Sequence, residues 1–133
     1  MKMIFVVAVW ILLLSCRNSA ITKKLKGSDS LVITFNAPNS DSVINTVSTT
    51  ETKAIQKLAR FLDGKPSDKK DCGFDGNMLF FKAGIQVMPV VFKYSKTDCR
   101  QFTYDLDNTV MKTGMSNEAA DFLKSLAEGK NWY

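Results

Sequence analysis

The chain has 133 residues, of which 45% are apolar and 11% aromatic, which favours one folded domain with one core over a disordered segment. The net charge is +5 and histidine is absent, so the usual proton shuttle and the commonest metal ligand are both missing. The basic residues do not cluster among aromatic ones as they do on nucleic-acid-binding surfaces. Composition therefore argues against a nucleic-acid partner and leaves any chemistry to carboxylates, Lys, Tyr or Ser.

The first 15 residues have the anatomy of a secretory leader. Lys2 supplies a positive charge, and an unbroken apolar run extends from Met3 to Leu14, as in a signal peptide. The run is too short to cross about 30 Å of hydrocarbon, which needs roughly 20 apolar residues. Residues 1–15 are therefore predicted to be a signal peptide rather than a membrane-spanning helix.

The end of the leader, Leu13-Leu14-Ser15-Cys16, resembles the lipobox of bacterial lipoproteins. That motif has Leu three places before the cysteine and a small residue directly before it, and Leu13, Ser15 and Cys16 match. The resemblance implies that a diacylglycerol is attached to the Cys16 sulfur, that the leader is cleaved before Cys16, and that the new N-terminus is acylated, for example with palmitate. An ordinary leader cut after Ala20 and an uncleaved anchor helix are the alternatives.

The residues after the cysteine bear on location. In the lipoprotein family an Asp directly after the cysteine favours retention in the inner membrane, and acidic residues there favour export to the cell surface in some bacteria. Arg17 occupies that place, and residues 17–20 (Arg-Asn-Ser-Ala) contain no acidic residue. The resemblance therefore implies a lipid-anchored protein of the bacterial cell envelope, at the outer membrane and facing the periplasm.

Residues 16–30 are predicted to be a flexible tether. They are polar, with lysines at positions 23, 24 and 26 followed by Gly27-Ser28-Asp29-Ser30, and they have the period of neither a helix nor a strand. Their basic side chains could lie against anionic headgroups. A solvated linker explains the same residues equally well.

Two strands are expected at the start of the folded domain. Between Leu31 and Phe35 apolar residues alternate with more polar ones, which is the period of a half-buried strand, and residues 38–41 (Pro-Asn-Ser-Asp) break it. Val43 to Val47 is rich in β-branched residues and predicts a second, short strand.

A helix is expected next. Residues 48–51 (Ser-Thr-Thr-Glu) fit a capping box, so the helix should start near Thr49, and its apolar residues recur at helical spacing until it ends near Leu62. A basic stripe lies on another side of this helix and would suit an acidic partner, although a solvated surface explains it equally well. The stripe consists of Lys53, Lys57 and Arg60.

The remainder predicts four strands and a helix. Pro89 marks an edge, a bulge or a break in the second of these strands, because proline cannot donate a ladder hydrogen bond. Ser116 is predicted to cap the final helix, which stops at Gly129. The strands are expected at Asn77–Lys82, Ile85–Tyr94, Cys99–Leu106 and Thr109–Thr113.

These connections are too short for crossovers, so the strands should pair antiparallel with both helices on one face. The predicted fold class is α+β: a mainly antiparallel sheet of about four to six strands with two helices on one face, in the order β(β)-α-β-β-β-β-α. Residues 31–128 would form a single domain and residues 129–133 a C-terminal tail. Along the strand from Cys99 to Leu106, Gln101, Thr103 and Asp105 are expected to face solvent.

Cys72 and Cys99 are the cysteines left over once Cys16 carries the lipid. An exported compartment is oxidising, so a disulfide is expected, with a stabilisation of about 3.5 kcal/mol in the chain-entropy model. Two cysteines without a histidine make a poor zinc site, and their spacing is not that of thiol oxidoreductases. The pair is therefore predicted to be structural, with no metal and no cofactor.

Two segments, residues 71–77 and 105–108, concentrate carboxylates and amides. Such groups could ligate calcium, but neither segment follows the spacing of a calcium-binding EF-hand loop. Turn chemistry alone favours Asp, Asn and Gly at such places. Asp105 and Asp107 are the least easily dismissed candidates for a catalytic role, but no pair of carboxylates has an evident acid and base arrangement. No catalytic residue is predicted, and the chain is not expected to be an enzyme.

The sequence thus favours a non-catalytic binding or accessory lipoprotein of the cell envelope. Its partners would be the membrane, through the lipid on Cys16, and a protein or envelope polymer. The alternative is a periplasmic enzyme-inhibitor or immunity lipoprotein, because small disulfide-stapled α+β domains suit that task.

Overall fold

The structure is a computed structural model, and it describes residues 20–38, 40–70, 72–130 and 132. The leader and Cys16 lie outside the described residues. Within these ranges the fold is α+β, as the sequence predicts, with one six-stranded antiparallel sheet and three α-helices. The elements are α2 (Ala20–Leu25), β1 (Ser30–Asn36), β2 (Val43–Thr49), α3 (Thr52–Phe61), β3 (Gly76–Lys82), β4 (Ile85–Lys93), the 3-10 turn η1 (Thr97–Cys99), β5 (Gln101–Leu106), β6 (Thr109–Gly114) and α4 (Asn117–Ala127).

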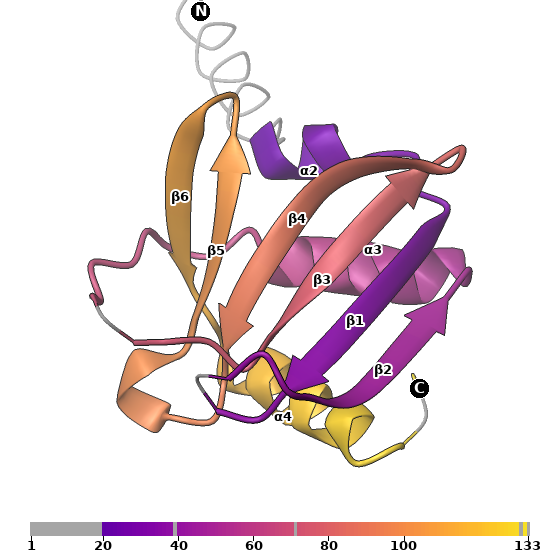
Figure 1. Cartoon of the computed structure of the whole chain (residues 1–133). Helices are drawn as coiled ribbons and strands as arrows, with labels where there is room; N and C mark the ends of the chain where they lie inside the picture. Colours follow the sequence, from indigo (N-terminus) through magenta and orange to yellow (C-terminus); the bar gives the residue numbers. More distant parts are fainter. Residues whose placement is uncertain (1–19, 39, 71, 131, 133) are drawn as a thin grey trace, which may run out of the picture.

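The strands lie in the order β2-β1-β3-β4-β5-β6, and every neighbouring pair is antiparallel. The β1–β2 hairpin therefore joins the β3–β6 meander through the pairing of β1 with β3. In Figure 1 the sheet is seen from its outer face, with α3 and α4 behind it. The molecule has two layers, a sheet and a layer of helices.

The core lies between these two layers. Alternate residues of the strands face it, and the most central of them are 0 to 1% exposed. The helices contribute apolar residues at helical spacing, among them Ile55 and Leu58 from α3 and Leu123 and Leu126 from α4. The fully buried strand residues are Leu31, Ile33, Phe35, Met78, Phe80, Val90, Phe92 and Phe102.

The prediction of a flexible tether for residues 16–30 is wrong from Ala20 onward. Ala20–Leu25 is a helix, and Ile21 and Leu25, one turn apart, are each 3% exposed in the core. Gly27 then turns the chain with a φ of +84°, in the left-handed region that favours glycine after a helix, and β1 begins at Ser30. A single apolar pair on a lysine-rich turn is too short a pattern to reveal a helix by its period.

The helix predicted to start near Thr49 begins three residues later. Thr49 is the last residue of β2 and is paired with Leu31, so the strand includes the first two residues of the proposed capping box. Glu51 is the N-cap residue and makes no capping bond through its side chain; instead its N–H donates to Thr49 Oγ1 at 3.0 Å. Pairing with β1 along the whole strand overrides the local capping signal. The expected end is confirmed, with Leu62 as C-cap.

The bounds of β3, β4, β5 and β6 lie within two residues of those predicted from the sequence. The predicted Ser116 cap is confirmed, because its hydroxyl accepts a hydrogen bond from Ala119 N at 3.1 Å. Pro89 lies one residue outside the β4–β5 pairing, which starts at Val90. The first half of β4 therefore pairs only with β3, so the expectation of an edge is confirmed, and Figure 1 shows β5 diverging from β4 there. The predicted C-terminal tail packs against the domain through Trp132, whose ring centre lies 6.3 Å from that of Phe122.

Candidate functional site

The outer face of the sheet, which the helices do not cover, is the main candidate surface. Its centre is an apolar row that crosses three strands: Leu79 of β3 is paired with Val32 of β1 on one side and with Pro89 of β4 on the other. Phe81 continues the row along β3, and Val91 along β4. Val91 is 42% exposed and Pro89 is exposed, whereas the other three are half-buried by their neighbours in the sheet.

Polar but uncharged side chains surround this apolar row. By the same pairing register they stand on the outer face. The charged residues of that face are Asp105 and Lys112, which lie further out on β5 and β6, and Lys93, which is buried at one end of β4. Among the described residues, the centre of the outer face thus carries apolar, hydroxyl and amide groups only. The flanking uncharged residues are Thr34, Thr46, Asn77, Gln86 and Thr103.

One corner of the outer face is closed by the segment that leads from α3 to β3. Pro66 forms a bridge with Thr113 at the edge of β6, and Ser67 Oγ donates to Gln101 Oε1 at 3.1 Å. Gln101 is only 5% exposed. The expectation that it faces solvent is therefore wrong, because a loop distant in sequence folds over the start of β5.

The predicted disulfide fastens this corner. Cys72, in the covering segment, is bonded to Cys99 of η1, with their Cα atoms 5.7 Å apart, and both residues are buried. The bond ties the start of β3 to the start of β5. The cysteines therefore restrain the part of the outer face that lies under the loop, and they leave the apolar row open.

Asp75 and Lys93 form a buried ion pair beneath the same corner. The Lys93 ammonium lies 3.1 Å from Asp75 Oδ1, and the two side chains are 6% and 4% exposed. The carboxylate also accepts from Tyr94 N at 2.8 Å, from Ser95 N at 2.9 Å and from Ser95 Oγ at 3.1 Å. Burial by itself raises the pKa of Asp75, but these hydrogen bonds outweigh it and hold the pKa below its usual value.

This arrangement makes Asp75 a structural carboxylate. Its charge is compensated by Lys93, and its donors hold the chain at the end of β4. A general base needs a raised pKa and a free lone pair toward substrate, and Asp75 has the opposite shift. Sequence reasoning grouped Asp75 with an acidic turn; an ion pair with a lysine 18 residues away gives no local sequence signal.

The two acidic residues weighed as catalytic candidates are not brought together with other reactive groups. Asp105 is exposed on β5, and the Asp107 side chain is 83% exposed in the β5–β6 turn. Asp107 and Asn108 have φ values of +51° and +66°, as a tight hairpin turn requires. Asp105 therefore belongs to β5, whereas Asp107 belongs to the turn and lies 3.9 Å from Lys24 Nζ.

Two tyrosines, the half-buried Tyr94 and the buried Tyr104, have raised pKa values. Burial raises the pKa of Tyr94, and the charges of Asp75 and Glu128 raise it further. Burial also raises the pKa of Tyr104, with a further contribution from Asp63. Both phenols are therefore neutral near pH 7, and Tyr104 faces the core from β5.

The basic stripe predicted on α3 is divided. Lys57 Nζ lies 4.1 Å from the centre of the Phe122 ring on α4, so this side chain packs across the neighbouring helix as a cation–π contact. Lys53 and Arg60 are exposed. The three cations do not form one continuous surface for an acidic partner.

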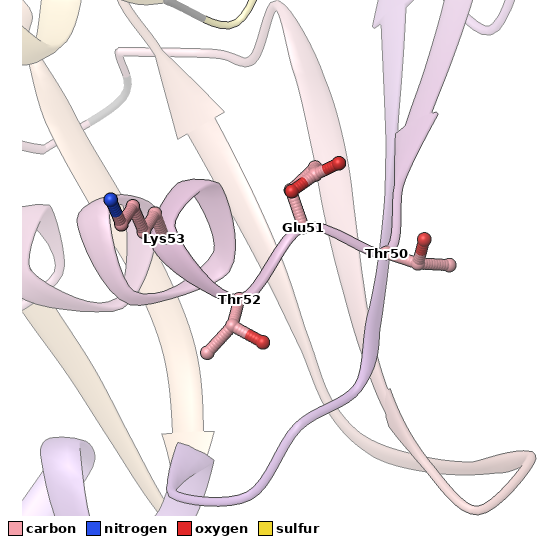
Figure 2. A pocket seen from close by; sticks show the side chains of 4 residues that line it. All are labelled: Thr50, Glu51, Thr52 and Lys53. Carbon is pink, nitrogen blue, oxygen red and sulfur yellow. The ribbon is translucent and has the colours of Figure 1, made fainter.

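A shallow depression lies where β2 passes into α3, and Thr50, Glu51, Thr52 and Lys53 line it. Figure 2 shows that these four side chains point in different directions. The depression is open to solvent and its polar groups do not converge on one point, as they would in a small-molecule site.

The described part of the chain contains no group of three or more Cys, Asp or Glu side chains placed to hold a metal ion. It also contains no helix long and apolar enough to cross a membrane. Cys16, the predicted site of lipid attachment, lies outside the described residues.

Comparison with protein-family models, with curated proteins and with solved structures gave no match. The class of the protein is therefore defined by its fold: a two-layer α+β domain, with one face of an antiparallel sheet covered by helices and the other carrying an apolar row.

Proposed function

We propose that this chain is a lipid-anchored protein of the bacterial cell envelope that binds a partner protein without catalysis. The anchor is the lipid on Cys16, supported by the lipobox-like residues 13–16, at the outer membrane on its periplasmic side. The observation that carries the binding function is the apolar row on the outer face of the sheet, formed by Val32, Leu79, Phe81, Pro89 and Val91.

A protein partner fits this surface better than a charged polymer does. The centres of protein interfaces are apolar and poor in charged residues, with a polar rim. The outer face has the same arrangement, because uncharged polar residues surround the row and the charged Asp105 and Lys112 lie beyond them. A polyanionic envelope polymer would instead be met by a cluster of lysines or arginines.

The binding surface is tested by affinity capture from detergent-solubilised envelopes with two matched variants. Val91→Lys places a charge in the centre of the outer face, and Gln56→Lys places the same charge on an exposed position of α3. We expect wild type and Gln56→Lys to recover the same protein and Val91→Lys to lose it, because an unpaired charge at the centre of an apolar interface is strongly unfavourable. Equal recovery by all three proteins would refute the binding surface.

The same experiment separates the alternative function. An inhibitor or immunity lipoprotein would recover one hydrolase in a one-to-one ratio and suppress its activity, whereas an accessory protein would recover a structural component of the envelope. Recovery of polymer alone would argue against a protein partner.

The non-catalytic part of the proposal is tested with a hydrolase screen on envelope polymers. We expect no turnover from wild type. Turnover that Asp105→Asn or Asp107→Asn abolishes, in a variant that remains folded, would overturn this part, because it would show that an exposed carboxylate performs catalysis.

The anchor is tested with Cys16→Ser. The thioether needs the cysteine sulfur, so we expect this variant to lose incorporation of labelled lipid and to accumulate as unprocessed precursor. Normal cleavage and release of the variant would instead favour an ordinary leader cut further along the chain.

A further inference from the structure

The folded domain starts very close to the proposed lipid. α2 begins at Ala20, four positions after Cys16, and Ile21 and Leu25 are buried in the core. Four residues of fully extended chain span at most about 14 Å. The short connection therefore holds the start of α2 near whatever surface carries the lipid.

α2 is fixed to one end of the sheet, together with the turn between β3 and β4. Asp29 N donates to Phe81 O at 2.9 Å, and Ala83 N donates to Asp29 Oδ2 at 3.0 Å. Figure 1 shows α2 at the end of the sheet where β3 passes into β4 and β5 into β6. Residues 20–30 and Lys82–Ile85 together are called the anchor end.

Exposed cations and one exposed apolar side chain dominate the anchor end. Ile85, the first residue of β4, is 72% exposed. The acidic groups are Asp29, which accepts from the Ala83 N–H, and Asp107, 3.9 Å from Lys24 Nζ in the neighbouring turn. Positive charge is therefore in excess, with four lysines against two aspartates. The lysines are Lys23, Lys24, Lys26 and Lys82.

We propose that the anchor end rests on the surface of a bilayer with anionic headgroups, with its four lysines among the headgroups and Ile85 at the interface. The proposal rests on the lipid attachment to Cys16 proposed above. Lysines beside a lipid anchor are attracted to anionic leaflets, and their aliphatic stems tolerate the interface. The several acyl chains proposed for Cys16 already attach the protein durably, so the electrostatic contact of the lysines sets the orientation of the domain on the bilayer.

This orientation fixes where the rest of the domain lies. β4 has 9 residues and is about 30 Å long at the usual rise of a strand. The opposite end of the sheet, with the β1–β2 turn and the disulfide, therefore lies about 30 Å from the bilayer surface. The apolar row, on the outer face between the two ends, remains accessible to a partner.

The test uses the lipidated mature chain in phosphatidylglycerol-containing vesicles that carry nitroxides on their headgroups. Ile85→Cys and Ile44→Cys each introduce one reactive thiol for a fluorophore, because Cys16 carries the lipid and Cys72 is bonded to Cys99. The two positions are matched, since Ile44 is 66% exposed and lies near the start of β2, at the opposite end of the sheet. We expect strong quenching of the label at Ile85 and weak quenching at Ile44.

Charge reversal provides the matched control. In the Ile85→Cys background, Lys23→Glu, Lys24→Glu and Lys26→Glu together should lower the quenching at position 85 until the ratio to position 44 is about one. Lys69→Glu, Lys70→Glu and Lys96→Glu change the net charge equally at exposed positions near the disulfide, and they should leave the ratio unchanged.

Two results would overturn the inference, and they are distinguishable. If the chain floats with the vesicles and both labels are quenched equally, the orientation is wrong and the lipid anchor stands. If the chain does not float with the vesicles and takes up no labelled lipid, the anchor proposed for Cys16 fails and the orientation fails with it.

Discussion

The two faces of the sheet differ in how the protein uses similar residues. Phe80 and Phe81 are neighbours on β3, yet Phe80 is fully buried under the helices and Phe81 is half-buried on the outer face. Burial of apolar area is the dominant favourable contribution to folding, and here it is concentrated on the covered face. The outer face keeps apolar side chains that stay partly exposed in the folded chain, and their burial by a partner is the contribution proposed above.

The largest expected effect on stability is on the covered face. Phe80→Ala removes a fully buried ring and should lower the free energy of unfolding by about 4 kcal/mol, which corresponds to a fall in Tm of roughly 4 to 8 °C per kcal/mol for a domain of this size. Phe81→Ala should lower it by about 1 kcal/mol. Chemical denaturation of both variants measures the difference, and equal losses would contradict the division between the two faces.

The disulfide tests the one corner of the outer face that is covered. Replacing Cys72 and Cys99 by Ala should lower the free energy of unfolding by about 3.5 kcal/mol, because the unfolded chain regains the entropy of an open loop. Hydrogen exchange should increase in the covering segment and at the start of β5 while the helices stay protected. In the wild type both thiols should resist alkylation until a reductant is added, and reactive thiols without reductant would refute the bond.

The ion pair beneath this corner should have a somewhat smaller effect. Asp75→Asn leaves the Lys93 ammonium buried without its counter-charge, and we expect a loss of about 3 kcal/mol at pH 7. Lys93→Met in the same background removes the uncompensated charge, so it should restore part of the stability. No recovery in the double variant would show that the hydrogen bonds to Tyr94 and Ser95, rather than the charge pair, carry the effect.

The pH dependence of this pair has a definite sign. Because the pKa of Asp75 is lower in the folded chain than its value of about 3.9 in an unfolded one, its contribution is fully present above that value and is lost as pH falls through the folded pKa. The difference in unfolding free energy between wild type and Asp75→Asn should therefore shrink as the pH falls from about 5 to strongly acidic values. Urea titrations at several pH values measure it.

Much of the fold can be predicted from the sequence because its signals are local. The alternation from Leu31 to Phe35 and the Ser116 cap each act within a few residues. The disulfide is also predictable, since two cysteines remain once Cys16 is assigned to the lipid and the proposed exported location would be oxidising. The α2 helix is not predictable, because its stability comes from tertiary burial of Ile21 and Leu25 rather than from a long repeating pattern.

The candidate site depends on which strands are neighbours in the sheet, and local patterns in the sequence do not reveal the order of the strands. Leu79, Val32 and Pro89 lie in one row only because β1 inserts next to β3 in the order of the sheet. The same is true of the burial of Gln101 beneath Ser67. Each of these contacts joins residues ten or more positions apart in the chain, where periodicity carries no information.

The smallest expected effect on stability is that of Val91→Lys, in the centre of the outer face. Val91 is 42% exposed, so a lysine stem can lie along the sheet with its ammonium in water, and the free energy of unfolding should change by less than about 0.5 kcal/mol. Val90, the next residue of β4, is fully buried, and Val90→Lys should prevent folding because its charge would enter the core. Thermal melts of the two variants give the comparison. If Val91→Lys melts as wild type does and still loses the captured partner, the loss of binding follows from the surface alone; if it unfolds like Val90→Lys, the outer face is part of the core and cannot be the binding surface.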